Sequence, residues 1–451
     1  MRTDVLIVGG GLAGLNAAAE LRERHPELAV TIADVGGGAS SEIMGFCAPV
    51  APEDSPALFR QDVLAAGGGL NTPELAAILA ERARPEMRRL EAMGIVFDRE
   101  ADGSYAAIRS IGSSCPRVVH AGTTTGKQAM RLLAAPVLPV RVVRLLKGRS
   151  GQIAGALTAE GEVIEAKAVI LAGGGFAGLW KFSTWSKALR GDALVLAMEA
   201  GAELCNLACV QFEPTVTVWP EAARGFPVIT TLLHEGAKLY DAAGNDLVAG
   251  GVPPKRELAI RIRRAIDAGR AFEHGGIRYD LSALDDAAFQ RKYPEYRQKY
   301  LQWFPAMDQV IFEVRPGAHT TLGGIRIDGS AATTVPGLFA AGEAVGNLHG
   351  RDRLGGNAGL EVFVFGRIAG ASAGDYAARQ TGWEEPLAEQ GGEEAPPPLA
   401  AFADILDRAF TVEPKPERLR AGLAELAALP PGGHAALVKQ VLEAALAASE
   451  A

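Results

Sequence analysis

The apolar positions at the start of the chain predict a strand, a helix and a second strand in close succession. Residues 4–8 (DVLIV) form a short β-branched run that is typical of a buried strand. A glycine-rich turn follows at 9–14, then an alanine- and leucine-rich segment to Arg24 that predicts a helix, then another apolar run at 29–33. This order within about 30 residues is the βαβ unit that opens a nucleotide-binding fold.

The same texture of strands and helices recurs farther along the chain. Helical periodicity predicts helices at 56–66 and 73–93, and several strands are expected within 140–171. After an interruption at 214–318, the glycine-rich, strand-like texture returns at His319 and lasts to about residue 374. The chain is therefore predicted to be an α/β protein whose nucleotide-binding part is split by an insertion.

The insertion and the C-terminal part differ from the rest of the chain in their residue composition and pattern. The insertion is more charged and carries an aromatic stripe at helical spacing, which we interpret as packing. Its members are Tyr293, Tyr296, Tyr300 and Trp303. The composition of 391–398 (GGEEAPPP) predicts a linker, and 399–451 predicts two or three amphipathic helices.

Composition narrows the class of protein. The 451 residues include 54 glycines without a collagen period, and the net charge is 45 − 53 = −8, which argues against broad nucleic-acid binding. Four scattered cysteines are too few for a disulfide scaffold and fit a reducing compartment. The apolar stretches 5–19 and 168–180 fall short of the roughly 20 residues of a membrane span. With no leader pattern at the N-terminus, a soluble cytoplasmic protein is expected.

The first glycines have the spacing of an adenine-dinucleotide site. Gly9 permits a tight turn, Gly11 lets a pyrophosphate approach the backbone, and Gly14 lets the helix pack close to the strand. Leu12 and Ala13 lie between them at the helix start, where free N–H groups hold phosphate charge. Asp34 follows Gly14 at the distance where a carboxylate accepts hydrogen bonds from ribose hydroxyls.

Two later segments favour FAD over NAD. The run 169–174 (VILAGG), which contains Ala172 and Gly173, looks like the second glycine-containing strand end of FAD proteins. The run 337–343 (GLFAAGE) resembles their C-terminal strand, and Glu343 after Gly342 is expected to grip the ribityl hydroxyls. FAD is the predicted cofactor.

Four further motifs carry a family resemblance: 38–41 (GASS), 190–192 (RGD), 319–324 (HTTLGG) and 349–357 (HGRDRLGGN). In this order over residues 1–385 they resemble the succinate dehydrogenase/fumarate reductase flavoprotein family, which includes L-aspartate oxidase. The resemblance implies a Rossmann-like FAD-binding domain in two parts, an α+β capping domain and a short C-terminal helical region. The implied bounds are 1–213 and 319–385, 214–318, and 396–451.

The resemblance also implies further FAD contacts beyond the glycine motif. These are Ser40, Ser41, Gly45, Val142, Asp192, Asn357 and Leu360. Some family members tether FAD through a histidine in the segment that matches 40–46, but this chain has none there, so noncovalent FAD is expected. The C-terminal region is shorter than in members that dock an iron–sulfur subunit, which argues against a complex of that type; a redox partner protein stays an alternative.

The family's reaction is hydride transfer between flavin N5 and a carbon next to a carboxylate. Carried over residue by residue, His319 and Arg353 grip the substrate carboxylate, and Arg256 transfers the proton. A guanidinium suits the first task because it can clamp a carboxylate with two hydrogen bonds.

Two positions depart from the family pattern. Glu213 in 211–215 (QFEPT) stands where members have a histidine, and a carboxylate there would repel a second substrate carboxylate. The alternative is that Glu213 pairs with Arg256 or another cation and never meets substrate. His234 stands where members have an arginine of a proton relay; it can relay a proton near neutral pH, or it is a surface histidine.

The sequence predicts an FAD-dependent oxidoreductase of a small carboxylate, by C–C dehydrogenation or enoate reduction. The alternatives are an amino-acid oxidase that resembles L-aspartate oxidase, and an electron-transferring flavoprotein subunit. Cys205 and Cys209 are expected four residues apart on a helix face, packed in the core, because no second pair completes a metal site. No metal is expected.

Overall fold

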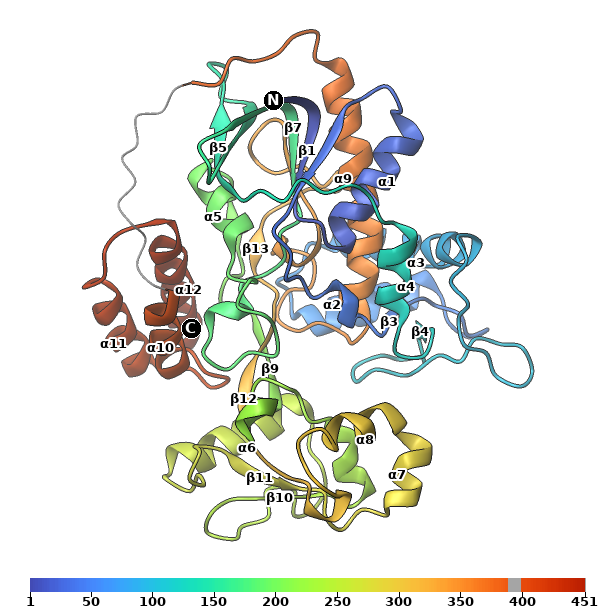
Figure 1. Ribbon diagram of the computed structural model, residues 1–451, viewed down its shortest axis with the longest axis vertical. Helices are drawn as coiled ribbons and strands as arrows, with labels where there is room; N and C mark the ends of the chain where they lie inside the picture. The colour runs from blue at the N-terminus through green and yellow to red at the C-terminus, as the bar shows by residue number, and fades with distance from the viewer. Residues whose placement is uncertain (388–398, 451) are drawn as a thin grey trace.

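The computed structural model describes residues 1–387 and 399–450, so the predicted linker at 391–398 lies outside the described residues. The molecule has two sheet-containing parts, one above the other along its long axis (Figure 1). The C-terminal helices lie beside the junction between the two parts (Figure 1).

The first part is built on a six-stranded sheet. Its strands are β1 (Arg2–Val8), β2 (Val30–Ala33), β5 (Val142–Lys147), β6 (Ile153–Thr158), β7 (Val163–Leu171) and β14 (Leu338–Ala340). The order is β2-β1-β7-β6-β5, with β14 also paired to β7. The pairs β1–β2, β1–β7 and β7–β14 are parallel. The predicted strands at 4–8, 29–33 and within 140–171 are confirmed.

Two helices from opposite ends of the sequence pack side by side on this sheet, α1 (Leu12–Arg24) and α9 (Asn357–Arg379) (Figure 1). Glycines of α9 make the contact close. A Cβ on Gly366 would lie 2.6 Å from the Ala13 carbonyl oxygen, and one on Gly370 would lie 2.4 Å from that of Ala17. The predicted helices at 56–66 and 73–93 are confirmed as α2 (Pro56–Gly67) and α3 (Pro73–Ala92).

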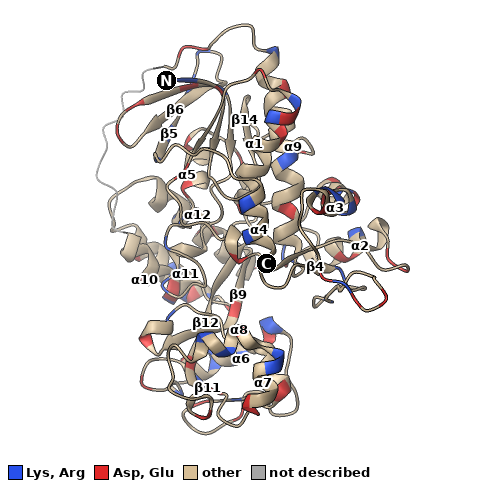
Figure 2. Ribbon diagram, turned by 45° about the vertical axis from the view of Figure 1, so that its right-hand side comes forward, with Lys and Arg blue, Asp and Glu red and all other residues tan. Residues whose placement is uncertain are grey.

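The second part is a four-stranded antiparallel sheet with helices, as expected of an α+β cap. Its strands are β9 (Val210–Trp219), β10 (Lys238–Tyr240), β11 (Ile277–Asp280) and β12 (Ile311–Thr321), and its helices are α6 (Lys255–Asp267), α7 (Asp286–Lys292) and α8 (Pro294–Tyr300). Basic and acidic residues are interspersed on these helices (Figure 2). The predicted boundaries at 213/214 and 318/319 fall inside β9 and β12, which join the two parts (Figure 1); the domain division itself stays a prediction.

The remaining elements are short or lie outside the two main sheets. They are β3 (Gly45–Cys47), β4 (Val118–His120), α4 (Thr125–Leu132), α5 (Asp192–Glu199), β8 (Leu204–Cys205), β13 (Gly324–Ile325), η1 (Ser40–Glu42), η2 (Ala177–Leu179), η3 (Glu221–Ala223), η4 (Thr230–Glu235), η5 (Met307–Gln309) and η6 (Gly342–Ala344), together with the C-terminal α10 (Leu399–Ala409), α11 (Pro416–Leu426) and α12 (Gly433–Glu450). In the described part of the chain, no helix combines the length and apolar character needed to cross a membrane.

The aromatic stripe packs as predicted. Tyr300 is fully buried, 5.2 Å from Phe312 and 6.0 Å from Phe289 between ring centroids. The other three members, Tyr293, Tyr296 and Trp303, pack partly buried against the same core.

The expected helix through Cys205 and Cys209 is wrong. Helix α5 ends at Glu199, and Gly201 adopts a positive φ of 85°, which stops the helix. Cys205 then pairs in a two-stranded sheet with Gly324 of β13. Both cysteines are free thiols.

A buried ion cluster holds α2 to the segment before β4. Arg117 is fully buried; its Nε and Nη2 donate to Asp54 at 2.7 and 2.8 Å, and its Nη1 donates to Asp62. Both carboxylates are also buried. Removing the cation would leave two buried negative charges without compensation.

We expect Arg117→Met to lower the free energy of unfolding by about 3–5 kcal/mol, because the buried carboxylates lose their partner. Urea unfolding of the FAD-loaded protein at about pH 7 measures this. Arg408→Met is the control, since Arg408 pairs with Glu425 at the surface and its loss is expected to change stability by under about 1 kcal/mol. Equal effects of the two substitutions would contradict the prediction.

Candidate active site between the sheet edge and the cap

The parallel strands bring the predicted nucleotide residues to one edge of the first sheet. Val8 at the end of β1 aligns with Ala33 of β2 and with Leu171 of β7, and Leu171 aligns with Ala340 of β14. The segments that follow these four strand ends therefore meet at this edge. They contain Gly9, Gly11, Gly14, Asp34, Ala172, Gly173, Gly342 and Glu343.

The three glycines of the first turn serve different needs. A Cβ on Gly9, whose φ is +117°, would lie 2.3 Å from the Ala172 carbonyl oxygen, and one on Gly14 would lie 2.0 Å from the Gly9 carbonyl oxygen. Gly11 has an ordinary φ of −73°, and its Cβ would meet only the Ser40 hydroxyl at 3.0 Å. The fold therefore requires the first and third glycines, whereas the second leaves space for a bound group.

Other features of this edge also fit FAD. The N-terminus of α1 points its free N–H groups to the turn, and the Leu12 N–H donates to Ser40 Oγ at 2.9 Å. Asn357, at the first turn of α9, is buried, and its amide oxygen and nitrogen have no hydrogen-bond partner in the described residues. Buried amides are nearly always paired, so Asn357 indicates a polar group supplied by a ligand.

Glu343 lies at the same edge, after the end of β14. Its Oε1 accepts from the Thr321 N–H at 3.0 Å and from the Thr321 hydroxyl at 3.1 Å. Burial raises the pKa of Glu343 to about 7. This carboxyl can therefore keep or lose its proton near neutral pH.

The remaining predicted cofactor residues lie around this edge or behind it. Ser41 is on η1 beside Ser40, Gly45 opens β3, Val142 opens β5 and Leu360 is fully buried in α9. Their FAD contacts, like those of Ala13 on α1, stay predictions.

Asp192 is engaged by protein cations. Its carboxylate pairs with Arg141 at 2.6 Å, Arg190 at 2.8 Å and His434 of α12 at 3.0 Å. Burial alone would raise its pKa, but hydrogen bonds from His434 and Arg190 lower the pKa of Asp192 to about 2. Its contact with FAD stays a prediction; in the structure it ties α5 to the C-terminal helices.

A β-bulge presents His319 where the long strands pass from one sheet to the other. The β9–β12 register shifts between Ala318 and Thr320, so His319 has no opposite residue. Its Nδ1 is 2.8 Å from the Thr184 hydroxyl, and its ring stacks on Trp185 at 5.4 Å. Burial, together with the charges of Arg353 and Lys255, lowers the pKa of His319 to about 3, so the imidazole is neutral.

Arg353 approaches the same place from the loop before α9. Its Nη1 donates to the Leu354 carbonyl at 3.2 Å and its Nη2 is 3.5 Å from the Thr320 hydroxyl. Its buried Nε has no partner in the described residues, and no carboxylate there forms an ion pair with it. Gln211 of β9 fixes the loop by donating to the Arg353 carbonyl at 3.0 Å. Arg353 and His319 are therefore neighbours, and their grip on a substrate carboxylate stays a prediction.

The buried side chain of Glu213 pairs with Lys255, not with Arg256. Its Oε2 accepts from Lys255 Nζ at 2.8 Å. The neighbouring Arg256 is exposed on α6. Hydrogen bonds from Arg264 lower the pKa of Glu413, and the charge of Arg256 adds to this effect, so Arg256 lies near the C-terminal region.

His234 is exposed on η4, and the adjacent Glu235 binds Lys292. The structure therefore brings neither His234 nor Arg256 into contact with His319 or Arg353. Their roles in proton transfer stay predictions.

The sequence reasoning missed Thr184, Trp185 and Lys255 as parts of this site. Lys255 was detectable in principle, since it stands beside Arg256 at the start of a predicted helix. Thr184 and Trp185 reach His319 only through the three-dimensional path of the segment after β7, and no local pattern marks them. Within the described residues, no group of three acidic, histidine or cysteine side chains is arranged to hold a metal.

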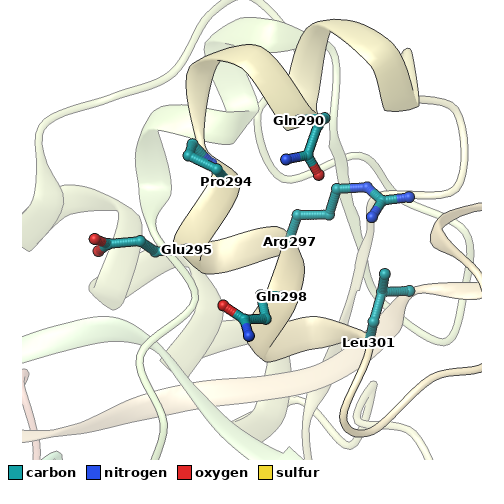
Figure 3. Close-up of a pocket in the computed structure, with 6 residues that line it drawn as sticks. All are labelled: Gln290, Pro294, Glu295, Arg297, Gln298 and Leu301. Carbon is teal, nitrogen blue, oxygen red and sulfur yellow. The ribbon is translucent and has the colours of Figure 1, made fainter.

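A hollow of about 390 Å³ on the cap is a separate feature (Figure 3). Its walls come from α7, α8 and the turn after them, and none of the predicted site residues is among them. They are Gln290, Pro294, Glu295, Arg297, Gln298 and Leu301. Glu295 also accepts from the Thr123 hydroxyl of the first part at 2.6 Å, so α8 touches the loop after β4.

Comparisons with known proteins agree with this geometry. The model of a family described as FAD binding domain matches residues 4–358. The chain is 34% identical over 397 residues to a fumarate reductase (CoM/CoB) subunit from Methanothermobacter marburgensis, covering 82% of this chain and 72% of the relative. It is 33% identical to L-aspartate oxidase of Caulobacter vibrioides, covering 82% and 75%.

A solved structure is similar over the whole chain. Mycobacterium smegmatis Sdh1 in complex with UQ1 superposes with a TM-score of 0.85 at 28% identity, covering 99% of this chain and 84% of the other. The fold expected from the sequence, an FAD-binding part with a capping part, is confirmed by this likeness.

We expect Gly11→Ala to keep the fold but to weaken FAD binding roughly tenfold or more, because the added methyl fills space meant for the ligand. The ratio of flavin to protein absorbance after dilution and filtration measures the loss. Gly14→Ala is the matched contrast: its methyl would strike backbone, so the unfolding temperature itself should fall. A Gly11→Ala protein that retains FAD like the wild type would refute the assignment.

We expect His319 to make the protein acid-sensitive. Its folded-state pKa of about 3 lies below its ordinary value of about 6.5, so between these values only the unfolded state takes up the proton. Stability is therefore present above about pH 6.5 and is lost as the pH falls toward 3. Between about pH 7.5 and 5, the wild type should lose about 1–2 kcal/mol more than His319→Asn.

Urea midpoints at the two pH values test this, with His274→Asn as control because His274 is exposed. The control should follow the wild type. The same pH dependence in all three proteins would contradict the prediction.

Proposed function

Because this chain belongs to the succinate dehydrogenase/fumarate reductase family of FAD-binding flavoproteins, we propose that this FAD-dependent oxidoreductase transfers hydride between flavin N5 and a carbon of a small carboxylate. The direction is C–C dehydrogenation or enoate reduction. The observation that carries the proposal is the meeting of Arg353 and His319 beside the edge where the FAD residues converge.

Arg353 is proposed to bind the substrate carboxylate. Its guanidinium has no carboxylate partner in the described residues and keeps a buried N–H unused, which leaves it free to clamp a carboxylate with two hydrogen bonds. Burial lowers its pKa from the ordinary range, yet an arginine stays charged at working pH. The same charge stabilises negative charge that develops on the substrate.

His319 is proposed to complete the grip as a neutral donor. We assign the Thr184 hydroxyl, 2.8 Å from Nδ1, as the donor of that hydrogen bond; the ring proton is then on Nε2, which can donate to a carboxylate oxygen. Stacking on Trp185 fixes the plane of the ring. FAD supplies the hydride-accepting or hydride-donating N5 when it is bound.

The proton is proposed to pass through Arg256 of the cap, with His234 as a relay residue. Their support is the family pattern and their places on α6 and η4. Both side chains are exposed, so solvent reaches them.

A second candidate, an amino-acid oxidase, is favoured by one observation. Glu213 is a buried carboxylate two strand positions from Gln211, which touches the Arg353 loop. A carboxylate at this position on β9 can accept a hydrogen bond from a substrate ammonium. The L-aspartate oxidase relatives are in keeping with this reading, whose product is an oxo acid and ammonia.

Cofactor attachment, partners and location complete the proposal. FAD is proposed to be noncovalent, since residues 40–46 contain no histidine. The fumarate reductase relative is named as one subunit of an enzyme, which supports a redox partner protein for this chain. The free state of all four cysteines supports a cytoplasmic location.

We expect one acid from a panel of succinate, L-aspartate, hydroxy acids and aromatic acids to bleach the visible flavin absorbance under anaerobic conditions. Arg353→Ala should lower the bleaching rate roughly 100-fold, because a charge-assisted clamp is lost. Arg351→Ala, an exposed arginine of the same motif, should bleach like the wild type. Bleaching that survives in Arg353→Ala, or no bleaching of dithionite-reducible FAD by any acid, would contradict the proposal.

A further inference from the structure

The Glu213–Lys255 ion pair lies beside the proposed carboxylate grip. Glu213 on β9 aligns with Gly317 of β12, two residues before the bulged His319. Lys255, the first residue of α6, is close enough for its charge to lower the pKa of His319, after the effects of burial and Arg353. The pair is therefore a neighbour of His319.

The two members of the pair differ in exposure. The side chain of Glu213 is 8% exposed, whereas that of Lys255 is 52% exposed. The carboxylate is thus shielded within β9, whereas the ammonium of α6 that pairs with it stays about half exposed. A ligand beside this pair would meet one hydrogen-bond acceptor and one donor, side by side.

The charges of these groups nearly cancel except at Arg353. Lys255 is matched by Glu213 at 2.8 Å, and His319 is neutral. Arg256 is not counted among these charges, because it is exposed and its charge lowers the pKa of Glu413. Arg353 makes no ion pair with a carboxylate in the described residues, but the charges of Glu343, Glu361 and Asp352 act on it. These carboxylates add negative charge around Arg353, so no surplus of positive charge remains for a second substrate carboxylate.

We infer that the site selects substrates of net charge −1, with one carboxylate on Arg353 and His319 and a neutral or zwitterionic group on Glu213 and Lys255. This inference rests on the proposed function and specifies its substrate class. An amide or hydroxyl can donate to Glu213 and accept from Lys255 together. A second carboxylate would have to displace Glu213 from Lys255 or lie against it, and both are unfavourable in a partly buried site.

The test compares malonate with malonamate, which have nearly the same shape but carry two charges and one at about pH 8. Titration of the FAD-loaded protein, followed by the difference spectrum of the flavin, gives a dissociation constant for each acid without turnover. We expect malonamate to bind at least tenfold tighter than malonate. Glu213→Gln keeps the shape but removes the charge, so the ratio should fall at least threefold.

Glu425→Gln is the matched control, because it removes one acidic charge from a surface pair with Arg408 and should leave the ratio unchanged. Equal or tighter binding of malonate by the wild type would overturn the inference and leave the proposed function standing. A spectrum that neither acid perturbs would overturn the proposed function and the inference with it. An unchanged ratio in Glu213→Gln would also overturn the inference, whatever the wild-type ratio.

Discussion

The parallel register of β2, β1, β7 and β14 is the constraint on which the rest of the molecule depends. Because side-by-side parallel strands end at one edge, segments separated by more than 300 residues deliver their polar groups to one place. The close α1–α9 contact keeps the two halves of this edge together, and it requires glycines at the crossing. A shift of one residue in any strand would turn its side chains to the other face and break the site.

The cap is tied to this edge by β9 and β12. These strands belong to the cap sheet, yet His319, Thr320 and Thr321 near the end of β12 contact Thr184, Arg353 and Glu343 of the first part. The predicted boundaries fall inside these strands. The composition of the chain changes where a strand passes from one part of the molecule to the other, and this point lies within the strand, not at its end. The proposed substrate site therefore lies where the two sheets join, since the joining strands carry its residues.

Sequence reasoning succeeded where local pattern and physics agree. The strand–turn–helix unit, the helices at 56–66 and 73–93 and the convergence of the glycine motif with Asp34 follow from periodicity and spacing. It failed at Cys205, because a positive-φ glycine stopped the helix. It also missed Thr184, Trp185 and Lys255, which reach His319 through tertiary packing and a β-bulge that no single-sequence pattern encodes. Motifs fix which groups are available, and packing decides which of them meet.

This distinction matters most at α6. Two adjacent cations, Lys255 and Arg256, begin the helix, and their side chains leave it in different directions because successive residues are about 100° apart around a helix axis. Lys255 therefore meets Glu213, whereas Arg256 lies toward Glu413. A motif match identifies one position in the sequence. On a helix, the side chain at the next position points in another direction and contacts a different neighbour. Rotation of α6 relative to β9 would change which of the two cations faces Glu213, so the donor at the site, an ammonium or a guanidinium, depends on the cap position as well as on the sequence.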